Sequence, residues 1–250
     1  MAMLEQCRQL ANEMRLLGMA ESLAARANEA IAENLQPTEF LRLVLQDEKL
    51  SRKNRAGQTL ITKARFRTNA DLEDWEDTYE RGLSKVHLKD LATMSFMRNR
   101  ENVIVYGKTG EGKTHLAIAL GRRICREGYR TSFYSVNLMF NELAAERAAG
   151  HYLKFIRRLA KDDVLILDDF GLRNYNHDEA QILLDILEER YRKGVCIVTS
   201  QVDSRGWGKL FEDSVISEAI IERLIKPSKI ITLKGGSYRD RLQQKCQAKT

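Results

Sequence analysis

Residues 103–120, VIVYGKTGEGKTHLAIAL, decide the fold of this 250-residue chain. The stretch begins with β-branched and aromatic residues, passes through a glycine-rich loop and continues with a pattern typical of a helix. The loop, residues 107–114, matches G-x-x-x-x-G-K-[ST], a pattern in which backbone N–H groups surround phosphate oxygens. The order strand, loop, helix therefore predicts a site for a nucleoside triphosphate.

Each residue type in this loop has a physical task. Glycine lets the backbone approach phosphate oxygens, and the helix that begins near Gly112 directs its positive end at them. Lys113 supplies a positive charge to the β- and γ-phosphates, and the hydroxyl of Thr114 is a ligand for Mg²⁺. We therefore expect ATP and Mg²⁺ as cofactors, bound along one segment: Gly107, Lys108, Thr109, Gly110, Glu111, Gly112, Lys113, Thr114 and His115.

From about residue 100, short apolar runs alternate with helical patterns. Strands are predicted at residues 102–106, 130–135, 164–168, 195–200 and 229–233. Helices are predicted to begin near Lys113, Leu138, Asp178 and Ser214. This alternation predicts an α/β fold, in which a mostly parallel sheet is covered by helices on both faces.

The N-terminal part, up to about residue 85, contains no strand-like run and has apolar residues at helical spacing. Gly18 marks either a turn or a close contact between two helices. Thr38 is predicted to cap a helix that ends near Gly57. The chain is thus divided into an all-α domain at residues 1–68, a linker at 69–98 and a nucleotide-binding domain at 99–250.

Polar residues close two of the predicted strands. The run at 164–167 ends in Asp168 and Asp169, where the acidic residue of a phosphate-loop enzyme is expected. We assign Asp168 to Mg²⁺ and Asp169 to orienting or deprotonating the attacking water. The strand at 195–200 is followed by Gln201, whose amide either senses the γ-phosphate, holds the attacking water or merely closes the strand.

Two arginines near the C-terminus have open roles. Arg223 adjoins the apolar face of a predicted helix, so it is either a salt-bridge partner or an arginine finger that reaches ATP on a neighbouring subunit. Arg239 follows the last predicted strand, from which it could approach the phosphates bound by its own subunit.

Basic residues are concentrated in one part of a chain whose formal net charge is +6. Residues 49–67 contain no acidic residue, and the segment at 71–80 is strongly acidic. The basic stretch is either a solvated helix surface or a site for DNA phosphates, through Lys49, Arg52, Lys53, Arg55, Lys63, Arg65 and Arg67. Because no zinc-finger spacing and no clear helix-turn-helix is visible, we expect backbone contacts with little sequence preference.

Other classes of protein are disfavoured by the composition. No window of 18 apolar residues predicts a membrane span, so no membrane partner is expected. The four cysteines are scattered, which fits a reducing cytoplasm better than a disulfide framework. A metabolite kinase would need a lid and a substrate pocket, for which the chain has no spare segment.

Several segments together resemble one family: YGKTGEGKTHLAIALG, VLILDDFG, IVTSQ, AIIERL and LKGGSYR. They are similar to the AAA+ ATPases of the IstB-like group, transposition helper proteins of insertion sequences that are related to the helicase loader DnaC. The resemblance runs from about Leu4 to Arg239. It implies a RecA-like AAA+ core without a C-terminal lid, preceded by a small helical domain.

The resemblance also implies a function. The protein would oligomerise on duplex DNA through ATP, remodel that DNA for an IstA-like transposase, and hydrolyse ATP to reset the assembly. Arg223 falls at the arginine-finger position and Gln201 at the sensor position. Asp169 stands where most AAA+ members have Glu, and Gln201 stands where Asn is usual. A replicative helicase loader acting on single-stranded DNA remains the alternative.

Overall fold

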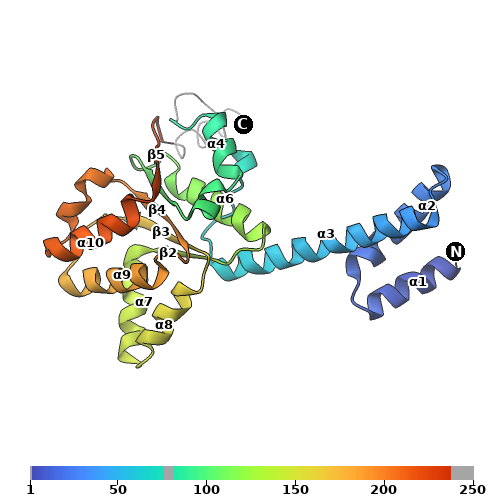
Figure 1. Ribbon diagram of the computed structural model, residues 1–250, viewed down its shortest axis with the longest axis horizontal. Coiled ribbons are helices and arrows are strands. Elements are labelled where there is room, and N and C mark those ends of the chain that lie inside the picture. The colour runs from blue at the N-terminus through green and yellow to red at the C-terminus, as the bar shows by residue number, and fades with distance from the viewer. Residues whose placement is uncertain (1, 76–81, 238–250) are drawn as a thin grey trace, which may run out of the picture. The chain divides into compact units, whose positions relative to one another are not determined.

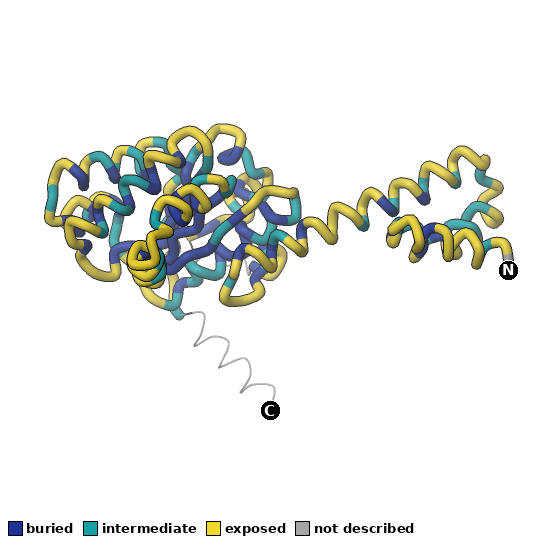
Figure 2. The backbone as a smooth tube through the Cα atoms, turned by 90° about the horizontal axis from the view of Figure 1, so that it is seen from below, coloured by how far each residue is buried: buried dark blue, intermediate teal, exposed yellow. Residues whose placement is uncertain are grey.

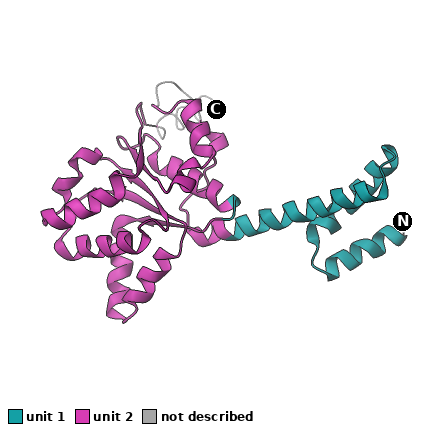
Figure 3. Cartoon of the chain, viewed as in Figure 1, with its two compact units in different colours: residues 1–59, 126–128 teal, residues 60–125, 129–250 magenta. Residues whose placement is uncertain are grey.

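The computed structural model describes residues 2–75 and 82–237, and the chain divides into two units (Figure 3). One unit comprises residues 1–59 with 126–128, and the other comprises residues 60–125 with 129–250. The domain borders that the sequence places after residues 68 and 98 stay predictions.

The first unit is built from helices, as expected (Figure 1). They are α1 (Ala2–Glu13), α2 (Leu17–Ala32) and the greater part of α3 (Pro37–Ala64). Because α3 begins at Pro37, Thr38 lies inside the helix, and its prediction as the cap is wrong. Proline suits a first helical position because the N–H that it lacks would have no partner there. The predicted end at Gly57 is also wrong, since one interior glycine costs only about 1 kcal/mol relative to alanine.

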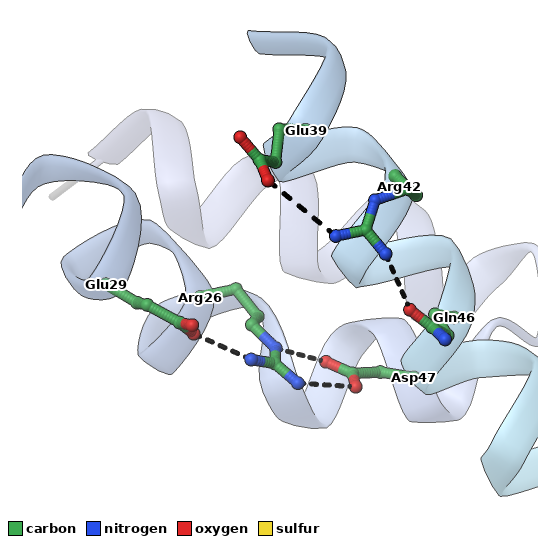
Figure 4. Close-up of polar contacts among 6 residues, drawn as sticks. All are labelled: Arg26, Glu29, Glu39, Arg42, Gln46 and Asp47. Carbon is green, nitrogen blue, oxygen red and sulfur yellow. Dashed lines mark hydrogen bonds and ion pairs between the residues drawn. The ribbon is translucent and has the colours of Figure 1, made fainter. Parts of the chain in front are cut away.

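Contacts between α2 and α3 fix this unit. A Cβ added to Gly18 would lie 2.3 Å from the Cβ of Ser51, which confirms the predicted close contact between helices. The guanidinium of Arg26 donates to both carboxylate oxygens of Asp47, at 2.8 and 2.9 Å, and to Glu29 at 2.7 Å (Figure 4). The bidentate pair lowers the pKa of the Asp47 carboxyl and sets the orientation of the two helices.

The second unit contains a parallel sheet with the strand order β2-β3-β4-β1-β5. The strands are β1 (Asn102–Tyr106), β2 (Thr131–Ser135), β3 (Val164–Phe170), β4 (Val195–Ser200) and β5 (Ser228–Thr232). All of the predicted strands are therefore confirmed, although β3 continues past its predicted end at Asp168. Since the strands are parallel, the loops at their carboxyl ends meet at one edge of the sheet.

Helices cover both faces of the sheet (Figure 1). Side chains of α4 (Lys85–Ala92), α5 (Ser95–Asn99) and α6 (Lys113–Arg126) enter one apolar cluster. The other cluster contains side chains of α7 (Val136–Ala148), α8 (Tyr152–Ala160), α9 (His177–Arg190) and α10 (Ser214–Ile225). Short 3₁₀ segments lie at η1 (Leu72–Asp74) and η3 (Ser204–Leu210). Helices α4, α5 and α8 were not predicted.

Alternate residues of the central strands face the two clusters. Val103 and Val105 of β1 pack with Leu116 of α6, whereas Ile104 packs on the opposite side with Leu183 of α9. Most residues of β1 to β4 are buried (Figure 2), whereas those of β5 are partly or fully exposed. No described helix is both long and apolar enough to cross a membrane.

Candidate functional site

The loop between β1 and α6 has a backbone that only glycine adopts easily. Gly110 and Gly112 have φ values of +88° and +91°, in the left-handed region. The carboxylate of Glu111 turns back into the loop, where it accepts a hydrogen bond of 2.6 Å from the backbone N–H of Lys108. A Cβ at Gly107 would lie 2.2 Å from the same carboxylate oxygen, so this position also requires glycine. The turn is therefore fixed by contacts within the loop.

Lys113 is the first residue of α6 and is only 6% exposed. Its Nζ donates to the backbone carbonyl of Lys108 at 2.8 Å, which holds the ammonium group across the loop. Burial lowers the pKa of Lys113, while the negative charges of Glu111, Asp169 and Asp168 act in the opposite direction. The ammonium group thus lies where the helix N-terminus and the loop N–H groups also provide positive potential.

Asp168 lies near the carboxyl end of β3, and its two oxygens have different surroundings. Oδ1 accepts hydrogen bonds from the hydroxyls of Thr114, at 2.9 Å, and Thr199, at 2.6 Å. Oδ2 is buried and has no hydrogen-bond partner among the described residues. Burial raises the pKa of Asp168, against the effect of both hydroxyls. An unpartnered carboxylate oxygen beside a threonine hydroxyl fits Mg²⁺, which prefers oxygen ligands, so Thr114 and Asp168 would hold the ion.

Asp169 is held in an unusual backbone conformation. Its φ is +60°, a region that few non-glycine residues adopt, and the pairing of β3 with β4 is irregular at this point. The N–H of Asp169 donates to the hydroxyl of Thr199 at 3.0 Å. Because the same hydroxyl donates to Asp168, Thr199 fixes both acidic residues from the adjacent strand.

These groups surround one cavity of about 580 Å³. Its walls combine the phosphate loop, both acidic residues and a segment that follows α3. Gln201 also lines it and accepts a hydrogen bond of 2.9 Å from the hydroxyl of Thr109, across the loop. His115 lies in the wall beside Trp75, with 6.2 Å between the ring centroids. A cavity with these walls can hold a nucleotide phosphate chain and a divalent cation.

The comparison with known families decides the identity of the chain. The sequence profile of the family described as "IstB-like ATP binding protein" matches residues 9–248. The chain belongs to the IstB-like ATP-binding family. The resemblance inferred from the sequence is thereby confirmed, and the cavity lined by the phosphate loop is the candidate ATP site of this IstB-like protein.

Curated relatives of this IstB-like protein match along nearly their whole length. One is described as an ATP-binding protein of insertion sequence IS5376 from Geobacillus stearothermophilus. It is 32% identical over 248 residues, which cover 98% of this chain and 99% of the relative. Another, from insertion sequence IS21 of Pseudomonas aeruginosa, is 31% identical over 92% of this chain and 87% of its own.

Solved structures with the same fold confirm the AAA+ architecture of this IstB-like protein. The DnaC helicase loader matches with a TM-score of 0.54 at 21% identity, over 66% of this chain and 97% of its own. AMPPCP-bound DnaA from Aquifex aeolicus matches with a TM-score of 0.57 at 18% identity, over 74% and 57% of the two chains. At sequence identities this low, the similarity to these two proteins shows a shared fold only.

Arg223 of this IstB-like protein does not lie with the other predicted catalytic residues. It is near the end of α10, where its backbone carbonyl accepts a hydrogen bond of 2.9 Å from Asn102 at the amino end of β1. The phosphate loop follows the carboxyl end of β1. Five strand residues span about 16 Å, so Arg223 and the loop lie at opposite edges of the sheet.

The side chain of Arg223 is ion-paired in the structure. Its guanidinium donates to Glu188 and, at 2.9 Å, to the carbonyl of Ala219. Its Nε is buried and has no hydrogen-bond partner within the described ranges. The salt bridge weighed from the sequence is therefore present, and the finger role stays a prediction. Arg239 lies outside the described residues.

The predicted DNA-binding residues are divided between the two units. Lys49, Arg52, Lys53 and Arg55 belong to the first unit, and Lys63, Arg65 and Arg67 to the second. Arg52 and Arg55 contact Glu48 at 2.6 and 3.5 Å, and Lys53 contacts Glu127 at 2.6 Å. The basic stretch thus acquires acidic partners that lie outside it in the sequence.

Two residues at the site were not predicted to take part in nucleotide binding. Among the described side chains, Thr199 has the only hydroxyl that contacts both acidic residues. The sequence feature that could have indicated this role is a polar residue at the end of a buried strand. Arg67, predicted to bind DNA, lines the nucleotide cavity instead of lying with the basic residues of the first unit. No spacing rule signals this placement, because Arg67 is far from the phosphate loop in the sequence.

Proposed function

We propose that this IstB-like protein is a Mg²⁺-dependent ATPase that assembles on duplex DNA, remodels it, and recruits and regulates a partner transposase. The observation that carries the proposal is the joint placement of Lys113, Thr114 and Asp168 around one cavity, in a chain of the insertion-sequence ATP-binding family. The helicase-loader alternative has less support, since DnaC shares the fold at only 21% identity.

The phosphate loop and the acidic residues have different roles in hydrolysis. The loop N–H groups and Lys113 bind the phosphates, and Asp169 lies in the cavity wall where it can orient the attacking water. Thr114 and Asp168 would hold Mg²⁺, which would supply positive charge to neutralise the phosphate oxygens. Gln201 lies across the loop at Thr109, in a place suited to sensing the terminal phosphate.

The position of Arg223 favours an assembly. It lines a second cavity, of about 550 Å³, together with Arg100, Arg192 and Lys226, and with Glu222, which pairs with Lys226 at 2.6 Å. Because this cavity lies at the amino edge of the sheet, its cations face away from the ATP site of the same subunit. A neighbouring subunit could place its nucleotide phosphates there, which would complete each ATP site with an arginine from the next subunit.

Imaging of the protein on duplex DNA tests the proposed function. We expect ordered assemblies on DNA with ATP and Mg²⁺, and dispersed protein after ATP is omitted. Transposase added to these assemblies should bind and accelerate hydrolysis. Monomers under all conditions would contradict the proposal. Assembly on single-stranded DNA alone would also contradict it and would favour the loader alternative.

Replacing Thr199 with Val tests how the acidic pair is positioned. The substitution preserves side-chain shape but removes the hydroxyl that contacts both acidic residues. We expect hydrolysis to fall about 10- to 100-fold because Asp168 and Asp169 lose their orientation. The free energy of unfolding should fall by about 1–3 kcal/mol, since the part-buried N–H of Asp169 loses its partner. Steady-state phosphate release and chemical denaturation measure the two effects.

Ser200→Ala is the matched control for this substitution. The hydroxyl of Ser200 is also buried, but it donates to the carbonyl of Phe170 and has no contact with the acidic carboxylates. This variant should lose stability while hydrolysis stays close to the wild-type rate. Equal losses of hydrolysis in both variants would assign Thr199 a purely structural role.

The salt dependence of DNA binding tests the basic residues of α3. Each phosphate contact contributes a slope of about −0.9 to log affinity against log salt. The triple substitution of Arg52, Lys53 and Arg55 with Ala should flatten that slope by up to about 3 and weaken binding to all sequences alike. The ion pairs of these three residues should not prevent them from binding DNA phosphates, because exposed ion pairs contribute only about 0–1 kcal/mol to stability. Fluorescence anisotropy of labelled duplexes at several salt concentrations provides the measurement.

Arg42→Ala is the control for this experiment. Arg42 is exposed on the same helix but lies outside the basic stretch, and it contacts Gln46 at 3.1 Å. It should leave the slope unchanged. An unchanged slope in the triple variant would exclude this part of α3 as the main DNA surface.

A further inference from the structure

The segment after α3 is held against the phosphate-loop helix. The ring of Phe66 packs on the backbone of α6, where a Cβ at Gly121 would lie 2.8 Å from two of its atoms. On the other side of Arg67, the guanidinium of Arg122 donates to Asn69 at 2.8 Å and to Asp71 at 3.0 Å. Since both Gly121 and Arg122 belong to α6, the segment is fixed to α6 on both sides of Arg67.

This attachment brings Arg67 into the wall of the ATP cavity. Thr114 and Asp168, the residues that fit Mg²⁺, line the same cavity. The Cζ of Arg67 lies 5.7 Å from the centroid of the Phe133 ring, within the range of a cation–π contact. Phe133 in turn packs edge-on against Phe66, at 6.2 Å between ring centroids. The aromatic contact is therefore made by the guanidinium of Arg67 itself, which is exposed and lines the cavity.

The charge of Arg67 is not neutralised by a close carboxylate. No ion-pair partner of Arg67 is found in the part of the chain that the structure describes, whereas Arg65 lies 3.6 Å from Glu142 and Arg122 pairs with Asp71. The positive charge of Arg67 acts on Asp168 across the cavity, where it opposes the effect of burial on the pKa of that carboxyl. A guanidinium fixed in this way can take a phosphate oxygen as its partner.

We propose that Arg67 contacts the γ-phosphate of ATP bound in its own subunit, and so distinguishes ATP from ADP. The inference rests on the proposed ATP site, and it replaces the DNA-binding role that the sequence predicts for this residue. Thr114 and Asp168 line the same cavity and would hold Mg²⁺ there beside the terminal phosphates of ATP, so we assign the γ-phosphate to Arg67. Arg67 is thus distinct from Arg223, which lies at the opposite edge of the sheet.

Nucleotide titrations of Arg67→Ala test the inference. We expect the Kd for the Mg²⁺ complex of AMPPCP to rise about 10- to 100-fold, since a charge-assisted hydrogen bond is lost. The Kd for ADP should change by less than about threefold, because no γ-phosphate is present. The Kd of Arg67→Lys for the Mg²⁺ complex of AMPPCP should lie between those of the wild type and Arg67→Ala, since lysine retains the charge without the planar guanidinium. Isothermal titration calorimetry measures all of these values without any need for hydrolysis.

Arg65→Ala is the matched control, since Arg65 is an exposed arginine in the same segment that pairs with Glu142. It should leave both nucleotide affinities unchanged. Duplex DNA binding without nucleotide should also be unchanged in Arg67→Ala, and thermal unfolding should show that the variant is folded. Equal changes in the affinities for AMPPCP and ADP, or weaker DNA binding with unchanged nucleotide affinities, would overturn the inference. A wild-type protein that binds neither nucleotide would instead refute the proposed function.

Discussion

Lys113→Ala should weaken ATP binding by about 100-fold or more and thereby abolish hydrolysis. The ammonium group of Lys113 is buried at the amino end of α6, where Glu111, Asp168 and Asp169 are close enough to affect its pKa. Without it, an incoming triphosphate would meet these carboxylates with less compensating positive charge. Repulsion by the carboxylates would therefore add to the loss of the direct phosphate contact. Titration with AMPPCP and steady-state phosphate release measure the two effects.

The same variant should fail to assemble on duplex DNA with ATP, while weak DNA binding without nucleotide persists. Lys108→Ala is the control from the same loop, since only the backbone groups of Lys108 contact Glu111 and Lys113. It should retain nucleotide binding. Because Lys113 also bonds within the loop, thermal unfolding must show that its variant is folded. Wild-type ATP affinity in a folded Lys113→Ala protein would exclude this cavity as the ATP site.

Arg223→Ala should leave ATP binding intact and reduce hydrolysis by about 10³-fold in assembled protein. The reason is geometric, since Arg223 lies beside the amino end of β1 whereas the phosphate loop follows the carboxyl end. An arginine in this position can act only on a nucleotide held by another subunit. The rate of ATP hydrolysis per wild-type subunit should therefore rise with protein concentration until assembly is complete.

Mixing two inactive variants provides the sharpest test of this role. Lys113→Ala subunits lack a working ATP site but keep Arg223. Arg223→Ala subunits keep the ATP site but lack the arginine. Mixed assemblies should recover part of the wild-type hydrolysis rate if the arginine acts between subunits. Glu188→Gln is the control, because it removes the ion pair of Arg223 but keeps the arginine. If Glu188→Gln loses as much activity as Arg223→Ala and mixing restores none, Arg223 has a structural role.

The sequence alone determined the parts of the molecule whose residues are contiguous. The phosphate loop could be predicted because its N–H groups, lysine and threonine occupy successive positions of one turn between a strand and a helix. The buried strands could be predicted because parallel strands that are covered on both faces consist of apolar runs. The start of α3 was less predictable, since Thr38 and Pro37 are both favourable at a helix N-terminus and only one position can be the first.

The tertiary structure decided what depends on the path of the chain. It placed Thr199 on the strand next to Asp168, put Arg223 at the edge of the sheet opposite the loop, and brought Arg67 to the ATP cavity through the packing of Phe66 on α6. It also supplied Lys53 of α3 with an acidic partner, Glu127, from a distant part of the chain. Spacing along a sequence reports contacts within one helix, strand or turn. Contacts between distant segments are set by how the sheet and its helices pack, and at this site they determine which charges meet the nucleotide.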